Sequence, residues 1–419
     1  MTRFNSQLAS VQFAGVLFVL LFGASRGVAQ QQAVAPLPQS INGILQQAGI
    51  PVPPEAQDPS SIASFERPES PFQYPPFVLM PHFLYRFLYE YGVLSHRGQP
   101  TTSLIDTFAP GFTLQAGDFW TLDYTANWDV YSNRAFRDTL GHSATVIGKN
   151  TFNNWTALLS QSYTYSSQPL VETGVQTTEQ EYRTSLNVSH GLTQNLLEET
   201  ILSQDLRFAL TFTDTYQWTV DQWVHYKLSS ELDTAIGGGA GYIHESQGSD
   251  SNYTEPEAQV SWRPASKVLV SLSGGLEHRV FLDYPRSSLN IPTYDLSFRY
   301  TPFEPTKLTL EVVRQVSPSL LTNESTRLTR ENFTLSQRIL KKFYLVGGIG
   351  NTGTDYLLDG QSGISARNDT QLTYSLKLSR PFAGRGTVSI FSYRSRNASS
   401  ELGYGFTTTQ FGLELSYRY

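Results

Sequence analysis

Histidine, serine and acidic residues are the side chains that could carry catalysis here, because none of the 419 residues is cysteine. The absence of cysteine excludes disulfides, thiolate metal sites and cysteine nucleophiles. The seven histidines are scattered, and none has the spacing of a metal site. His142 and Ser143 are adjacent, so on a strand they point to opposite faces and cannot pair. We therefore predict no catalytic residue, no metal and no cofactor.

Charged residues recur at alternate positions of several segments, with aromatic or aliphatic residues between them. Arg86 and Glu90, for example, lie within the aromatic segment Phe83–Tyr91. Because side chains alternate across a strand, such segments place charges on one face and apolar groups on the other. The residues predicted to line a wet interior are Arg86, Glu90, Asp123, Asp129, Arg183, Asp295, Arg299, Glu311, Glu414 and Arg418.

These interior charges allow two interpretations. They could create a transverse field at a constriction, which orients polar solutes, or they could be neutralising pairs that hydrate and stiffen the wall. A closed barrel pairs its last strand with its first, so the two ends of the chain share a seam. The charges expected to meet there are Glu414, Arg418, Arg86 and Glu90. Since both signs are present, strong ion selectivity is not predicted.

The C-terminal segment Phe411–Tyr419 shows the alternation most clearly. Its aromatic and leucine residues occupy one face, and Gly412, Glu414, Ser416 and Arg418 occupy the other. An aromatic final residue on the apolar face is typical of the closing strand of an outer-membrane barrel. We expect the barrel-assembly machinery to bind this strand.

The N-terminus is predicted to be a cleaved signal peptide, residues 1–29. Arg3 supplies a positive charge, and the apolar run Phe13–Ala24 is too short to span a bilayer. Gly27 and Ala29 are small residues at the two positions that a signal peptidase reads, so cleavage is expected after Ala29. Residues 30–82 are polar and proline-rich, which predicts a disordered periplasmic leader. The barrel is predicted to occupy residues 83–419.

Composition favours a membrane barrel over other classes. Mean hydropathy is −0.27, and no apolar run after the signal approaches the roughly 20 residues of a transmembrane helix. Aromatic residues nevertheless make up 13% of the chain. A barrel requires this combination, because only alternate residues face lipid and aromatic side chains ring both interfaces. The net charge of −6 and the lack of a basic tract argue against nucleic acid as a partner.

Short turns recur about every 34–42 residues, the length of one hairpin of spanning strands. They are Ala116–Asp118, Lys149–Asn153, Gly191–Asn195, Ser229–Glu231, Pro264–Lys267, Pro302–Thr306, Lys341–Lys342 and Pro381–Gly386. Longer polar stretches alternate with them, and Asn351–Asn368 is expected to fold inward as a constriction. The count predicts an all-β, antiparallel up-and-down transmembrane barrel of about 18 strands, or about 16 if the first hairpin is misassigned.

Two smaller features have structural interpretations. The run Gly237–Gly241 lacks the lysine and helix of a phosphate loop, so it indicates tight packing within a strand. Most tyrosine and tryptophan residues fall on the lipid-facing side. Trp223, Phe391 and Tyr393 are exceptions, and three scattered rings do not form a sugar track.

Several motifs resemble the outer-membrane β-barrel porins often found with exopolysaccharide genes. These motifs are Trp262-Arg263-Pro264, Tyr300-Thr301-Pro302 and the ending Phe411–Tyr417, and the resemblance covers roughly Phe83–Tyr419. It implies a channel or an export-associated barrel and carries over no catalytic residue.

We therefore predict a Gram-negative outer-membrane channel for passive diffusion of small polar solutes, with lipid as its partner. A component of exopolysaccharide export, with export proteins as partners, is the first alternative. A barrel-embedded hydrolase, which needs histidine, serine and carboxylate together, is the second. The sequence is also compatible with a homo-oligomer.

Overall fold

The computed structural model describes residues 72–283, 287–358 and 365–418, and these form strands and connections without a helix. None of the described residues belongs to a helix that could span a membrane. The predicted signal peptide and most of the predicted leader lie outside the described residues. The strands are β1 Gln73–Tyr74, β2 Phe77–His96, β3 Gln99–Ala116, β4 Trp120–Tyr131, β5 Thr139–Phe152, β6 Trp155–Pro169, β7 Gln176–Gly191, β8 Leu196–Ala209, β9 Thr215–Lys227, β10 Leu232–Glu245, β11 Ser251–Ala265, β12 Val268–Phe281, β13 Ser287–Phe303, β14 Thr306–Pro318, β15 Glu324–Ile339, β16 Phe343–Leu358, β17 Ser365–Phe382, β18 Gly386–Ser399 and β19 Phe406–Arg418.

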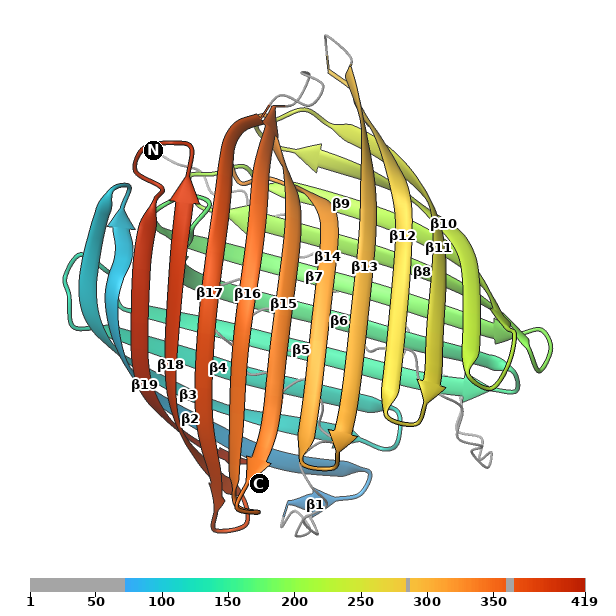
Figure 1. Ribbon diagram of the computed structural model, residues 1–419, viewed down its shortest axis with the longest axis horizontal. Coiled ribbons are helices and arrows are strands. Elements are labelled where there is room, and N and C mark those ends of the chain that lie inside the picture. The colour runs from blue at the N-terminus through green and yellow to red at the C-terminus, as the bar shows by residue number, and fades with distance from the viewer. Residues whose placement is uncertain (1–71, 284–286, 359–364, 419) are drawn as a thin grey trace. The chain divides into compact units, whose positions relative to one another are not determined.

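The strands β2 to β19 form one closed antiparallel barrel (Figure 1). Each strand pairs with its neighbours in sequence, and β19 pairs with β2 from Arg418–His82 to Thr409–Tyr91. The short strand β1 pairs only with the start of β2. Eighteen of the nineteen described strands, all except β1, build the wall. The predicted antiparallel barrel of about 18 strands is therefore confirmed.

The connections differ in length between the two ends of the barrel. At one end, here called the tight-turn end, they are as short as Asn153–Asn154 and Glu304–Pro305, and all eight predicted short turns overlap them. At the other end, the loop end, connections such as Ser132–Asp138 and Leu170–Val175 are longer, apart from the Arg97–Gly98 turn.

Strands extend further toward the loop end than the sequence indicates. The stretch Asn351–Asn368 was expected to be an inward loop, which is wrong for its described part. Asn351 pairs with Leu372 and Asp355 pairs with Asn368, as rungs of the β16–β17 ladder. Polar side chains in this stretch suggest a loop, but the backbone hydrogen bonds of the hairpin continue through it. The first long strand also begins earlier than expected. Strand β2 starts at Phe77, within the residues assigned to the leader.

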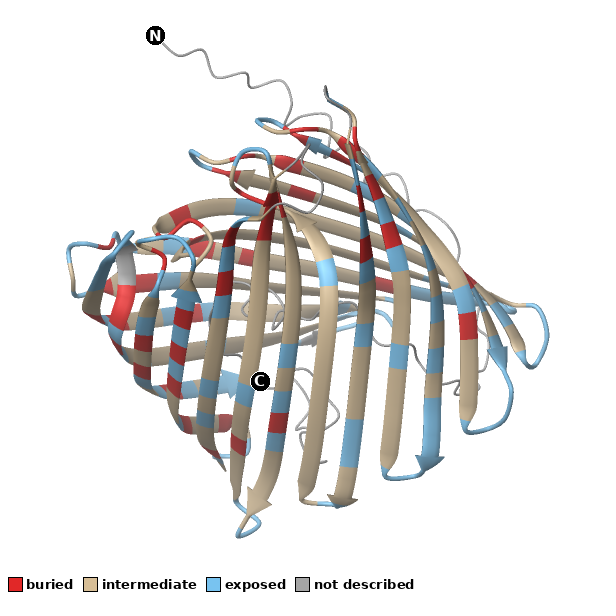
Figure 2. Cartoon of the chain, turned by 45° about the horizontal axis from the view of Figure 1, so that its top comes forward, coloured by how far each residue is buried: buried red, intermediate tan, exposed pale blue. Residues whose placement is uncertain are grey.

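The alternation predicted from the sequence sorts side chains by exposure. Outward residues such as Phe83, Tyr89 and Leu413 are 38%, 42% and 40% exposed, whereas Glu90 and Glu414 are 6% and 8% exposed. Buried residues of β10–β13 gather toward the loop end (Figure 2). A barrel has no central core, and two small hydrophobic clusters, around Tyr131 and around Phe281, pack instead beneath the loops.

The glycines of β10 make room for large side chains of the neighbouring strands. A Cβ atom at Gly237 would lie 2.6 Å from the Trp223 ring, and one at Gly241 would lie 2.3 Å from the Tyr253 ring. The structural interpretation of this glycine run is therefore confirmed, because side chains of β9 and β11 lie across it.

Replacing Gly237 by valine should destabilise the barrel by about 1–3 kcal/mol, the usual cost of overpacking. The added carbons would meet the Trp223 ring and the backbone oxygen of Gln222. Urea unfolding in detergent, followed by heat-modifiable mobility, measures the change. Gly353→Val is the control, because no atom lies within 4 Å of a Cβ there. Equal midpoints for the two variants would contradict this account of the glycine run.

Candidate channel lumen

The seam between the first and last strands of the barrel holds one carboxylate between two cations. Glu414 of β19 is the direct cross-strand partner of Arg86 of β2. Arg86 Nη2 lies 2.9 Å from Glu414 Oε2, and Lys377 Nζ of β17 donates to Glu414 Oε1 at 2.7 Å. Arg86 and Glu414 therefore meet as expected. Lys377 was missed because it reaches the pair across β18, which sequence spacing does not reveal.

The other two seam residues do not join this cluster. Arg418 is 62% exposed and lies 3.8 Å from Asp123, which also has His82 at 3.6 Å. Glu90 is separated from both pairs and accepts a hydrogen bond from Gln410 at 2.6 Å. The expectation that all four seam charges meet at one point is thus wrong. Residues four positions apart on a strand are about 13 Å apart, too far for direct contact.

The remaining predicted residues have varied partners. Arg183 bonds Glu181 and lies 3.1 Å from Asp205, whereas Asp129 accepts hydrogen bonds from uncharged side chains only. Among the described residues, no ion pair involves the three others, which are Asp295, Arg299 and Glu311. The register places all ten predicted residues on the same face of the wall as Glu414. Their role in lining a pore stays a prediction.

The loop Leu170–Val175, between β6 and β7, folds into the barrel. Leu170 and Val171 line one cavity together with inward residues of distant strands, including Arg86 and Lys377. A constriction was expected from the long stretch before β17, but this shorter loop reaches the interior instead. No signal in the loop's composition distinguishes it, because its inward position depends on partners elsewhere in the barrel.

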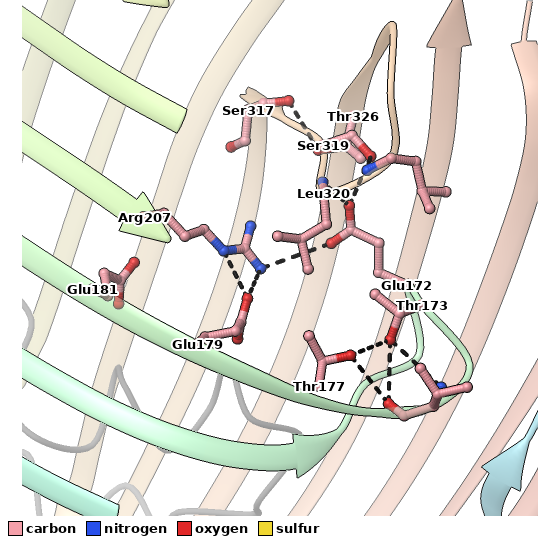
Figure 3. Close-up of polar contacts among 12 residues, drawn as sticks. Glu172, Thr173, Thr177, Glu179, Glu181, Arg207, Ser317, Ser319, Leu320 and Thr326 are labelled. Carbon is pink, nitrogen blue, oxygen red and sulfur yellow. Dashed lines mark hydrogen bonds and ion pairs between the residues drawn. The ribbon is translucent and has the colours of Figure 1, made fainter. Parts of the chain in front are cut away.

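Glu172 anchors this loop to connections across the barrel (Figure 3). Its Oε1 accepts hydrogen bonds from Ser319 Oγ at 2.7 Å and from the Leu320 amide at 2.6 Å. Its Oε2 lies 3.9 Å from Arg207 Nη2, and Arg207 also bonds Glu179 at 2.7 Å. Ser319 and Leu320 are fully buried, so the two hydrogen bonds to Glu172 Oε1 are shielded from water on their donor side.

Two arginines hold the backbone of the same loop. Arg367 is 1% exposed and donates from Nη1 to the Glu172 carbonyl at 3.1 Å. Its guanidinium lies between the rings of Tyr356 and Tyr404, 3.7 and 3.8 Å from their centroids. Arg97 donates to the Thr173 carbonyl at 3.3 Å. Contacts of a cation with aromatic faces are strongest where water is excluded, as here. We call Glu172, Arg207, Ser319, Leu320 and Arg367 the loop knot.

The three off-phase aromatic residues are in different places. Phe391 and Tyr393 line the cavity beside the β6–β7 loop, whereas Trp223 lies over Gly237 on the β9–β10 wall. The prediction that they form no continuous track agrees with this separation.

The histidines show no hydrolytic arrangement among the described residues. His225 contacts Glu199 and Asp233, and His244 contacts Asp250, but no hydrogen bond joins a histidine to a serine. Within the same residues, no cluster of three potential ligands could hold a metal ion. The requirement set by the hydrolase alternative is therefore not met in the described part of the chain.

No protein-family model and no curated protein matches this chain. Among solved structures, it is similar to OccK2 (OpdF) of Pseudomonas aeruginosa, at 8% identity over 81% of this chain and 98% of that chain, with a TM-score of 0.45. OccAB3 of Acinetobacter baumannii matches at 8% identity over 81% and 99%, with a TM-score of 0.47. A BenF-like porin of Pseudomonas fluorescens Pf-5 matches at 7% identity over 81% and 98%, with a TM-score of 0.45. None of these names refers to exopolysaccharide, so that resemblance gains no support.

Replacing Glu414 by glutamine should destabilise the barrel by about 3 kcal/mol, because it leaves two largely buried cations without their counter-ion. Arg418→Gln is the matched control at the same seam, and it should change stability by less than about 1 kcal/mol, as for an exposed pair. Urea midpoints of the two variants measure the difference. A larger loss for Arg418→Gln would show that the seam is held elsewhere.

Replacing Glu172 by alanine should loosen the loop knot, because Ser319, the Leu320 amide and Arg207 all lose a partner. Amide exchange of Leu320 should accelerate about tenfold, which corresponds to the loss of a buried hydrogen bond to a charged group. Asp118→Ala, at the tight-turn end, is the control. Hydrogen exchange with mass spectrometry measures the exchange rate at Leu320 in both variants. An unchanged rate in Glu172→Ala would count against the loop knot.

Proposed function

We propose that this chain is an outer-membrane channel through which small polar solutes diffuse passively. The observation that carries the proposal is the closed barrel of β2–β19, with an apolar aromatic outer face and a charged inner face. Barrels of 16–18 strands leave an aqueous lumen, whereas about eight strands are filled by side chains. Passive diffusion through such a channel requires neither a catalysed reaction nor a cofactor.

The same proposal assigns an orientation and a maturation step. The tight-turn end and the C-terminus face the periplasm, and the loop end faces outward, as is general for such barrels. The signal peptide is removed after Ala29, and the proline-rich leader precedes the first long strand in the periplasm. The assembly machinery binds β19. No observation favours exopolysaccharide export over diffusion.

Inward acids that form no ion pair among the described residues suggest the ionic preference of the pore. Asp221, Glu255, Glu257, Asp295 and Glu311 face inward from β9, β11, β13 and β14 and take part in no ion pair of the described residues. Most inward arginines, by contrast, are paired with carboxylates, and Arg299 and Arg330 are exceptions. Rings or walls of one charge select ions of the opposite sign. We therefore propose a preference for cations, where the sequence predicted no strong selectivity.

Single-channel recording in planar bilayers under a potassium chloride gradient tests the function. We expect stable current steps with a reversal potential on the cation-selective side. Neutralising Asp221, Glu255 and Glu257 together, to Asn or Gln, should move that potential toward zero or beyond. Neutralising three acids of the connections, Asp118, Glu231 and Glu401, is the control and should move it less.

A folded, heat-modifiable barrel that gives no steps would refute the open channel. Steps with anion preference would leave the channel standing and refute the role of the acidic wall. The two results are therefore separable in one experiment.

A further inference from the structure

A cavity of about 160 Å³ lies between the β6–β7 loop and the wall opposite it. Its walls come from β16 to β19 and from β2 to β4, which are continuous across the seam, and from the end of β6 with Leu170 and Val171 of the loop. The cavity combines carboxylates, cations and apolar side chains, and the arrangement of these three kinds decides what it can hold.

Two carboxylates of the cavity form no ion pair with any residue that the structure describes. Glu90 and Asp129 are 6% and 7% exposed. Glu90 accepts a hydrogen bond from Gln410, and Asp129 accepts one from Thr107 at 2.6 Å and one from Gln168 at 2.9 Å. Uncharged donors keep a buried carboxylate in place but leave its charge uncompensated. Both groups line the cavity with no cation beside them in the described part of the chain, so a cationic ligand would supply the missing partner.

The cations of the cavity are already occupied. Arg86 and Lys377 both bind Glu414, at 2.9 and 2.7 Å. Counting the charged groups that line the cavity gives three carboxylates against two cations. An anionic solute would have to compete with Glu414 and approach Glu90 and Asp129, so this is not an anion site.

An apolar row separates the two carboxylates. Leu88 pairs with Ile105, and Ile105 pairs with Tyr131, across β2, β3 and β4. Glu90 follows this row on β2, and Asp129 precedes it on β4. Tyr393 and Val171 line the same cavity. Hydrogen-bonding side chains such as Gln371, Ser395 and Gln410 also line the cavity, so the apolar row occupies only part of its wall. A hydrocarbon group that covers this row is removed from water, which is favourable.

We propose that this cavity is a binding site for small organic cations that carry an aromatic or short aliphatic group. The hydrocarbon part packs against the Leu88–Ile105–Tyr131 row and Val171, and the ammonium group lies beside Glu90 or Asp129. The aromatic faces of Tyr131 and Tyr393 add favourable surfaces for a cation. This inference rests on the proposed channel, since solutes reach the cavity through the lumen.

The test uses three probes on the full chain in planar bilayers: 2-phenylethylammonium, ethylammonium and phenylacetate. 2-Phenylethylammonium should interrupt the potassium current for the longest times, because only this probe has both a ring and a positive charge. The double variant Glu90→Gln with Asp129→Asn should shorten those interruptions roughly tenfold, as expected for loss of a charge-assisted contact. Asp118→Asn, which removes an exposed charge of the β3–β4 turn outside the cavity, should leave them unchanged.

A second variant separates the apolar contribution from the charge. Val171→Ser should shorten the interruptions caused by 2-phenylethylammonium and leave those caused by ethylammonium unaltered. Equal interruptions by all three probes, or longest interruptions by phenylacetate, would overturn the assignment while the current itself upholds the channel.

Should the folded barrel carry no current, the channel fails, and calorimetric binding to the detergent-solubilised chain decides the cavity independently. Heat of binding from 2-phenylethylammonium that is lost in the double variant upholds the site. No difference between the probes, or no effect of the variant, overturns it.

Discussion

Closure of the sheet is the constraint on which the described structure depends. An open sheet edge leaves a row of backbone amide and carbonyl groups without partners, and a closed barrel has no such edge. Here the pairing of β19 with β2 removes the edge. The Arg86–Glu414 pair lies on that closing ladder, so this inward ion pair joins residues 328 positions apart in sequence. The charges and loops inside the barrel depend on this closure.

Closure also creates an interior that is too wide for side chains to fill, and this determines where the polar groups go. Several inward arginines pair with a carboxylate of the same strand or of an adjacent one, as Arg279 does with Glu277 and Arg183 does with Asp205. Pairing of this kind hydrates the wall without creating a strong net field. On the β9–β14 wall the acids outnumber their partners, and near β2–β4 two carboxylates rely on uncharged donors. The interior is therefore asymmetric, which a ring of evenly paired charges would not be.

The parts of the fold that could be predicted are those governed by local rules. Alternation in segments such as Phe411–Tyr419 predicts strands, and turns recurring at hairpin length predict their number. Strand ends at the loop side could not be predicted, because polar residues of β16 and β17 look like loop while their backbones still pair. The cross-strand contact of Arg86 with Glu414 follows from closure. Lys377 and the Glu172 contacts do not, because they depend on how far side chains and a loop reach across the lumen.

The β6–β7 loop has two roles, because the same short segment contributes Glu172 to the loop knot and Leu170 and Val171 to the cavity. Glu172 is held by Ser319, Leu320 and Arg207, while Leu170 and Val171, the two residues before it, line the cavity. A backbone fixed at one residue restricts its neighbours to a small set of positions. The depth at which Val171 enters the lumen is therefore set by contacts of a carboxylate that does not line the cavity. In this barrel the width of the interior depends on buried polar contacts at the loop end, and not on the strands of the wall alone.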